Sequence, residues 1–511
     1  MMPRRIPTGF DMALASVLVA RWRSRDDPAD DEALNRVWDI LDGENAVIAG
    51  TALHRELFAT PRASEFFELR PLQAQPGQPA DKLDAVVVKE LMDNALDAAE
   101  SVDGQPDIAL TIRDDGERVV ITVTDNGPGM APELIDQVLN FSVLVSDKAA
   151  YRSPTRGLQG NALKTIIGIP TALGSHDPVV IDSLGIRHTI RASIDPAGEV
   201  HIDHEQAETE ATPGTTITVT VPPRRPTRWD LIEGSFGLIR EPVQLADEDW
   251  ARSFALVNPH AQIRALHANC AEPAEPVSYK PSVGDAWHKP LPTDPTSPHW
   301  YDTGALERLV FAHINKIRRG GPDVPIGEFV RSFAGLSSTA KAKTVCAELS
   351  AVGHLSDFEA HRELVGVLLS AMQANSRAPK PSVLGQVPEH HYQACFAGWF
   401  GLVHRADGTP RFWFKRATIT DGTVPWVMEV ALAETERPGK LFYAVNYSPS
   451  FDDPLARLAL AAGDLASTGA ASFLRQLDAY PDGRNNRAAA IHLISPAVSF
   501  LDKGKSTLAL R

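Results

Sequence analysis

The 511-residue sequence has few cysteines, and this absence excludes two classes of protein. Its three cysteines, Cys270, Cys346 and Cys395, stand far apart, and none has a His or Cys partner at the spacing of metal ligands. A small disulfide-stapled domain and a zinc finger are therefore both excluded. A reducing, cytoplasmic compartment fits this cysteine usage.

Long hydrophobic runs and an excess of positive charge are also missing. The apolar run at residues 12–20 is short and is followed by Arg21 and Arg23, so we expect no signal peptide, no spanning helix and no membrane partner. The formal net charge of −15 argues against a chain coated in nucleic acid, although a local basic groove is compatible with that average. The length predicts about three domains, because globular domains average roughly 150 residues.

One stretch concentrates polar groups on a single helical face. Residues 86–100 read VVVKELMDNALDAAE, without Gly or Pro. Because successive helical residues are about 100° apart, Glu90, Asn94 and Asp97 fall within an arc of about 60°. Such a stripe would normally face solvent. The alternative is that it faces a pocket, where a carboxylate activates water and an amide oxygen binds a hard cation such as Mg²⁺.

Two further stretches follow, and each is weak evidence alone. Residues 118–124, RVVITVT, predict a strand that ends in Asp125-Asn126-Gly127-Pro128-Gly129-Met130, which an ordinary turn would also explain. Residues 153–164, SPTRGLQGNALK, form a glycine-bearing loop that leads into an apolar helix. Backbone N–H groups at the start of that helix are available to an anion.

Taken together, in this order and at these spacings, the three stretches resemble the N, G1 and G2 boxes of the GHKL (Bergerat-fold) ATPases. This family includes gyrase-type topoisomerases, heat-shock chaperones, histidine kinases and MutL-type proteins. The sequence Gly214-Thr215-Thr216, before a strand at residues 217–221, is similar to the last box of the set. The resemblance implies an α/β sandwich with a mixed sheet that binds ATP and Mg²⁺.

The family's roles are carried over onto the matching residues. Glu90 would be the general base, Asn94 the Mg²⁺ ligand, and Asp125 the acceptor for the adenine amino group. Gly129 would let the backbone approach the base, the 157–160 loop would cover the phosphates, and Thr215 would lie near the adenine. The nucleotide-binding residues implied are Asn94, Asp97, Asp125, Gly127, Gly129, Met130, Arg156, Gly157, Leu158, Gln159, Gly160, Asn161, Ala162, Lys164 and Thr215.

The remaining sequence is similar to the topoisomerase VI B type within this family. Residues 59–91, which include an expected aromatic helix at 63–69, and the element Asn258-Pro259-His260-Ala261 carry this likeness. We expect an N-terminal extension at residues 1–62, with helical stretches near 12–22 and 32–41. A GHKL ATPase domain follows at 63–284, a helical domain at 285–380 and a transducer-like domain at 381–511. Strands are expected at 107–113, 118–124, 179–183, 187–194, 199–203 and 215–221.

The helical domain resembles a helix-two-turn-helix insert at residues 325–349. Basic residues cluster near it, namely Lys316, Arg318, Arg319, Arg331, Lys341 and Lys343. They could face the phosphates of double-stranded DNA, but a solvated helical surface explains them equally well.

The C-terminal part is expected to carry strands at residues 411–416, 424–433, 440–447 and 488–494, and a helix over 453–479. The loop SFLDKGK at 499–505 is similar to the transducer loop that presents a lysine to the γ-phosphate. Lys505, or alternatively Lys503, is the candidate for that lysine. The alternative is an exposed basic tail.

The resulting hypothesis is the ATP-hydrolysing component of a topoisomerase VI B-like complex. ATP would close a homodimer, and the partners implied are a topoisomerase VI A-like subunit and double-stranded DNA. An alternative is a nucleotide-gated, chaperone-like scaffold in DNA metabolism or defence without strand cleavage. A histidine kinase fits less well, because a long chain follows Gly214 and His54 lacks the expected surrounding motif.

Overall fold

The computed structural model describes residues 62–141, 151–156, 162–196, 198–223, 247–269, 275–284, 286–421, 423–451, 453–454 and 486–498. Residues Pro61–Arg511 form one compact unit. The helices expected at 12–22 and 32–41 lie outside the described residues. Among the described residues, no helix is long and apolar enough to span a bilayer.

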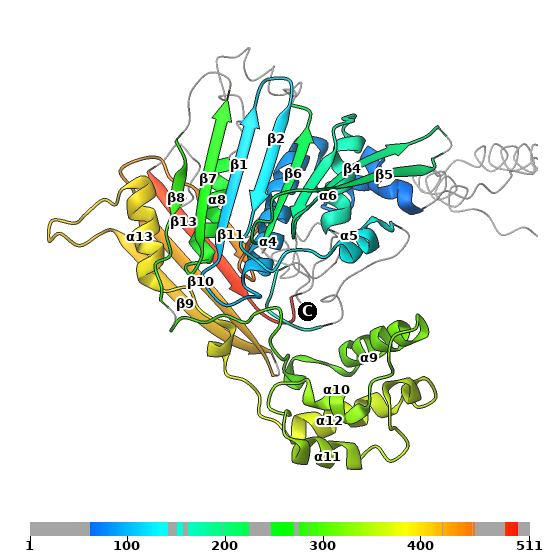
Figure 1. The fold of residues 1–511 in the computed structure, drawn as a ribbon. Helices are drawn as coiled ribbons and strands as arrows, with labels where there is room; N and C mark the ends of the chain where they lie inside the picture. The colour runs from blue at the N-terminus through cyan, green and yellow to red at the C-terminus, as the bar shows by residue number, and fades with distance from the viewer. Residues whose placement is uncertain are drawn as a thin grey trace, which may run out of the picture. The chain divides into compact units, whose positions relative to one another are not determined.

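The first part of this unit is built on a mixed sheet, drawn from blue to green in Figure 1. Its eight described strands have the order β5-β4-β3-β6-β2-β1-β7-β8, with β1 and β7 parallel and the other neighbours antiparallel. The strands are β1 (Asp107–Asp114), β2 (Val119–Thr124), β3 (Val179–Ser183), β4 (Ile186–Ile194), β5 (Val200–Glu208), β6 (Thr215–Val221), β7 (Gln262–Asn269) and β8 (Val277–Tyr279). Each strand expected in this part is present, and β5 runs five residues further than expected.

Helices cover this sheet because its strands alternate buried and partly exposed residues, so that one face is apolar. The covering helices are α4 (Leu83–Ala99), α6 (Ala162–Ala172) and α8 (Asp247–Val257), and α5 (Pro132–Leu139) packs beside α6. Val87, Ile166 and Phe254 from three of these helices share one core with Ile121 of β2. The α/β sandwich is therefore confirmed.

The segment before α4 differs from the expected single helix at residues 63–69. It forms a 3₁₀ helix, η1 (Arg62–Phe66), then α3 (Leu69–Gln73) and η2 (Ala80–Lys82). Phe66 and Phe67 both make edge-on contacts with Phe141, at centroid distances of 5.4 and 4.7 Å. These two adjacent aromatic residues both pack onto Phe141. They can do so because the chain leaves the 3₁₀ helix η1 at Phe66 and begins α3 only at Leu69.

A group of helices follows the sheet, in yellow-green in Figure 1. These are η3 (Pro298–Trp300), α9 (Thr303–Arg318), α10 (Ile326–Arg331), α11 (Thr339–Ala347), η4 (Leu355–Glu359), α12 (Leu364–Ala374), η5 (Pro381–Leu384) and α13 (Glu389–Phe400). Helix α9 begins where the Asp302 carboxylate accepts a hydrogen bond from the Ala305 amide, the usual N-cap arrangement. Leu306, Phe329 and Leu368 share the buried core of this region.

A second, smaller sheet completes the unit. Its order is β12-β11-β13-β10-β9, with strands β9 (Phe412–Asp421), β10 (Val424–Glu434), β11 (Leu441–Val445), β12 (Ser448–Pro449) and β13 (Arg487–Ile494). The expectation of one strand over 440–447 is wrong at its end, because β11 stops at Val445 and a two-residue turn, Asn446-Tyr447, leads into β12. The helix expected at 453–479 lies almost wholly outside the described residues.

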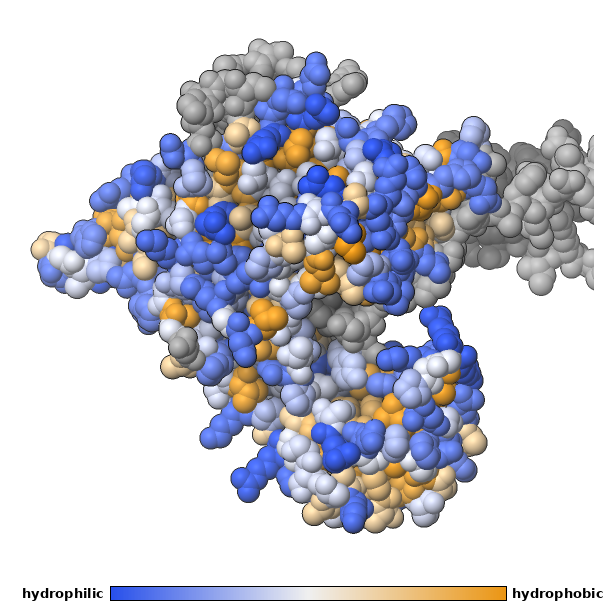
Figure 2. All heavy atoms as spheres, in the orientation of Figure 1, coloured by the Kyte–Doolittle hydropathy of each residue, from blue (hydrophilic) through white to orange (hydrophobic). Residues whose placement is uncertain are grey.

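The face drawn in Figure 2 is covered mainly by hydrophilic residues, with hydrophobic ones in scattered groups. Apolar atoms contribute a large share of the surface of most folded proteins.

Candidate functional site

Helix α4 carries the polar stripe predicted from the sequence. Its apolar residues, including Leu91 and Leu96, are fully buried in the core of the first sheet. That packing turns Glu90, Asn94 and Asp97 to a single side, where each is only partly buried. The Glu90 side chain is 16% exposed, so its carboxylate remains accessible to water.

Two charged residues flank the stripe and were not singled out from the sequence. Lys89 donates to Asp93 at 2.8 Å and lies 3.6 Å from Glu90. Burial by itself would lower the pKa of Lys89, but the charges of Asp93 and Glu90 outweigh it and raise the pKa to about 12. Lys89 is therefore a permanent cation next to Glu90. The second oxygen of Asp93, Oδ1, is buried and has no hydrogen-bond partner among the described residues.

Asp125 stands where β2 ends, directly beside the start of β6. Its Oδ1 accepts hydrogen bonds from the backbone N–H groups of Gly127, at 2.8 Å, and Thr215, at 3.3 Å. The Asp125 amide in turn donates to the Thr215 carbonyl at 3.0 Å. Within the described residues no hydrogen bond reaches Oδ2, so one oxygen is held by the protein and the other can accept from a ligand.

The environment of Asp125 is less polar than that of an ordinary surface carboxylate. Its side chain is largely buried, and this desolvation raises its pKa to about 6, although the two amide hydrogen bonds act in the opposite direction. A buried carboxylate with one oriented oxygen is suited to read a single N–H donor on a ligand.

The loop after Asp125 is tied to both α4 and the sheet. A Cβ on Gly127 would lie 2.8 Å from the backbone carbon of Ala98, so only glycine permits this approach to the end of α4. Further along, the Met130 amide donates to the Ser183 hydroxyl at 2.7 Å, and that hydroxyl lies 3.3 Å from Thr215 Oγ1. Gly129, the residue before Met130, lies beside Ser183 and Leu184.

The third predicted box is only partly described. Gly157, Leu158, Gln159, Gly160 and Asn161 lie outside the described residues, as do Lys503 and Lys505. Ala162 begins α6, and Lys164 is buried in the first turn of that helix. The Lys164 ammonium donates to the Asn140 carbonyl at 2.6 Å, and burial lowers its pKa.

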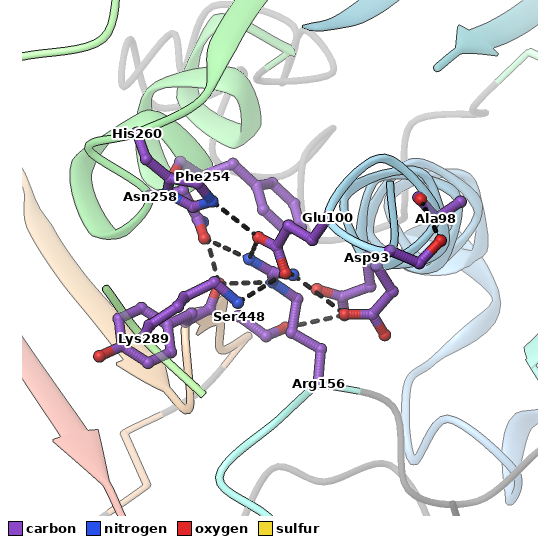
Figure 3. Close-up of polar contacts among 12 residues, drawn as sticks. Asp93, Ala98, Glu100, Arg156, Phe254, Asn258, His260, Lys289 and Ser448 are labelled. Atoms are coloured by element: carbon purple, nitrogen blue, oxygen red, sulfur yellow. Dashed lines mark hydrogen bonds and ion pairs between the residues drawn. The ribbon is translucent and has the colours of Figure 1, made fainter. Parts of the chain in front are cut away.

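Arg156 immediately precedes residue 157, and protein groups satisfy all the donors of its guanidinium. The donors reach Asp97 at 3.0 Å, Glu100 at 2.9 and 2.7 Å, the Tyr447 carbonyl at 3.1 Å, and Asn258 Oδ1. Arginine has five N–H donors, and five hydrogen bonds are present. Figure 3 shows Arg156 between Glu100 and Asn258. Arg156 and Asp97, both expected at the nucleotide, therefore bind each other in this structure.

The residues of α4 fit a Mg²⁺ ion if phosphate and water complete its coordination shell. Among the described residues no group of three or more His, Cys, Asp and Glu side chains could hold a metal by itself. Mg²⁺, however, typically takes one or two protein oxygens and completes its shell with phosphate and water. Asn94 provides an amide oxygen beside Glu90 on the partly exposed side of α4 and would be the protein ligand of such an ion.

Comparison with known proteins agrees with these features. Residues 81–225, which contain the α4 stripe, the Asp125 loop and Thr215, match the family described as histidine kinase-, DNA gyrase B- and HSP90-like ATPase. These residues thus form a domain of the GHKL ATPase class, as the sequence boxes predicted.

More specific similarity is to the B subunits of type 2 DNA topoisomerase 6. That of Natronomonas pharaonis is 34% identical over 206 residues, covering 39% of this chain and 23% of the relative. That of Saccharolobus shibatae is 25% identical over 300 residues, covering 57% and 51%. The matches thus span between about a quarter and a half of these relatives.

Solved structures resemble this chain only loosely. The N-terminal domain of a DNA repair protein is 12% identical, with a TM-score of 0.37 over 83% of this chain and 87% of that one. The ATPase region of Saccharomyces cerevisiae topoisomerase II bound to ICRF-187 (dexrazoxane) is 10% identical, with a TM-score of 0.34 over 83% and 77%.

The approach of β6 to Asp125 yields a test of the site's geometry. Gly214 has a φ of +80°, and a Cβ there would lie 1.9 Å from the Asp125 carbonyl oxygen. Gly198 has a φ of +86° but no atom within 4 Å of its Cβ position, so it is a matched control. Gly198→Ala should cost about 1–2 kcal/mol from backbone strain alone. Gly214→Ala should cost about 1–3 kcal/mol more, from the forced displacement. Equal thermal unfolding midpoints for the two variants would contradict this geometry.

Proposed function

We propose that this protein is a Mg²⁺-dependent ATPase that acts as the ATP-binding, dimerising component of a topoisomerase VI B-like DNA-processing complex. The observation that carries the proposal is the convergence of the α4 stripe with the Asp125 loop. Gly127 brings the loop against Ala98 near the end of α4, and both elements lie within the matched ATPase domain. The names of the relatives support the topoisomerase part of the proposal.

In this proposal Asp125 reads the adenine. Its free Oδ2 accepts a hydrogen bond from the exocyclic amino group, while the Gly127 and Thr215 amides hold Oδ1. A guanine presents a carbonyl oxygen at the equivalent position, and two acceptors cannot bond to each other. Asp125 therefore favours ATP over GTP, because GTP would leave the buried carboxylate unpaired.

Glu90 would act on the attacking water. Its accessible carboxylate can accept a proton as the water approaches the γ-phosphorus, and Lys89 provides a fixed positive charge 3.6 Å from that carboxylate. Asn94 would bind Mg²⁺, which when present neutralises charge on the phosphates. Lys505, or Lys503, is proposed to complete the phosphate contacts from the C-terminal segment. DNA, bound by the basic residues of the helical region, and an A-type subunit are proposed as partners.

Replacement of the general base should separate binding from hydrolysis. Glu90→Gln preserves the size of the side chain but cannot accept the proton, so turnover should fall by about 10²-fold or more while ATP still binds. Steady-state phosphate release and calorimetry measure the two quantities. Glu133→Gln, an exposed position on α5, is the control and should hydrolyse ATP normally. Normal turnover in Glu90→Gln would remove Glu90 from the mechanism.

The raised pKa of Asp125 predicts how nucleotide affinity depends on pH. The ionised carboxylate is the form that accepts from adenine, and with a pKa of about 6 it is mostly ionised at pH 7. Below pH 6 protonation competes with binding, so affinity should fall by about tenfold per pH unit. Calorimetry between pH 5 and 8 tests this. Asp125→Asn should bind weakly, and subtracting its pH profile removes the contribution of phosphate protonation. Parallel profiles for the two proteins would place the adenine elsewhere.

Dimerisation should depend on nucleotide. With Mg²⁺ and a saturating non-hydrolysable ATP analogue, light scattering of the native protein should shift from monomer to dimer, whereas ADP should produce a smaller shift because it lacks the γ-phosphate. Protein that binds the analogue yet remains monomeric would argue against a dimer gate and for ATP hydrolysis without one.

A further inference from the structure

A buried polar cluster links α4 to the second sheet. It consists of Asp97 from α4, Glu100 directly after that helix, Arg156, Asn258, His260, Lys289 and the Tyr447 carbonyl. Figure 3 shows most of these side chains converging on Arg156. We call this set the Arg156 cluster.

The charges of the Arg156 cluster are balanced. The Glu100 carboxylate accepts hydrogen bonds from Arg156, from Lys289 at 2.6 Å and from His260 at 2.9 Å. Although burial alone would raise the pKa of Glu100, the positive charges of Arg156 and Lys289 hold it well below its ordinary value. Burial lowers the pKa of His260, so at pH 7 its imidazole is neutral and donates through Nε2. Two cations therefore face the two carboxylates Asp97 and Glu100.

On the other side of the cluster lies the turn of the second sheet. Asn446 and Tyr447 have φ angles of +48° and +66°, as the tight turn between β11 and β12 requires. This conformation is unfavourable for a residue as bulky as tyrosine. Arg156 and Asn258 both donate to the Tyr447 carbonyl, at 3.1 and 3.0 Å, and Lys289 lies 5.0 Å from the centroid of the Tyr447 ring.

A second link joins the same two elements. The Ser448 hydroxyl donates to Asp93 Oδ2 at 2.8 Å, and Asp93 also binds Lys89, the neighbour of Glu90. Ser448, the first residue of β12, is thus bonded to α4 directly through Asp93, and the turn before it is bonded indirectly through Arg156. Around the helix, Asp93 and Glu100 lie on one border of the polar stripe and Asn94 on the other. A displacement of the turn would therefore be transmitted to the helix that carries Glu90.

We infer that Arg156 is a positioning residue, which fixes the Asn446-Tyr447 turn of the second sheet to α4 and so couples the two when nucleotide binds. All five of its donors are occupied by protein groups, which leaves none for a phosphate. The inference rests on the proposed ATPase function, because α4 must carry the nucleotide-binding stripe for the coupling to have an effect.

Two variants distinguish positioning from phosphate contact. Glu100→Gln weakens the Arg156 cluster without altering the arginine, and Arg156→Lys retains the charge but cannot make five hydrogen bonds. If Arg156 positions α4, both variants should lose about tenfold or more in kcat while the Kd for a non-hydrolysable ATP analogue changes less than about threefold. Arg264→Ala, which breaks an exposed pair with Asp107, is the matched control and should retain full turnover.

A second readout follows the turn itself. Hydrogen exchange of a peptide covering residues 441–450 should change on addition of the analogue to native protein, and this change should be absent in Arg156→Lys. Loss of analogue affinity in Arg156→Lys with normal kcat in Glu100→Gln would overturn the inference in favour of a phosphate contact. Identical nucleotide-dependent exchange in the native protein and Arg156→Lys would also overturn it. Absence of analogue binding to the native protein would instead refute the proposed ATPase.

Discussion

The hydrogen-bonded ion cluster around Arg156 is the interaction on which the arrangement of this molecule depends. A buried guanidinium is tolerated only when its charge is balanced and its donors are satisfied, and here both conditions are met. The required partners come from four separate parts of the chain: α4, the residues after α8, Lys289 and the Tyr447 turn. Loss of any one of them leaves a charged or polar group buried without its partner. For a buried ion pair that typically costs about 3–5 kcal/mol.

This dependence gives α4 two roles. Its apolar residues hold it against the sheet, and its polar stripe has one border directed toward the proposed nucleotide and the other toward the second sheet. Glu90 and Asp93 are only three residues apart, and the same lysine contacts both carboxylates. The proposed catalytic base and the contact with the second sheet are therefore parts of one local charge system, in which a change at either border alters the field at the other.

The Asp125 loop shows a complementary principle, in which backbone geometry prepares a carboxylate for recognition. Gly127 and Gly214 permit backbone approaches to Ala98 and Asp125 that any side chain would block. These approaches deliver two amides to one carboxylate oxygen and leave the other unused. Burial makes an unpaired carboxylate costly, so a ligand that provides the missing donor is favoured over one that does not.

Local sequence pattern alone determined much of this protein. Periodicities of 3.6 and 2 residues predicted α4 and most strands of both sheets, because apolar side chains must lie on the faces that pack. The strands β7, β8 and β12 were not predicted. The stretches around Glu90, Asp125 and Gly157, with the sequence at Gly214, predicted the GHKL class through their resemblance to the boxes of that family. Only the tertiary structure decided where Arg156 and Asp97 are directed, and that Glu100, Lys289 and Tyr447 meet them. Those contacts join residues up to 291 positions apart in the chain. No local pattern encodes such pairs, because a buried charge selects its partners by three-dimensional proximity.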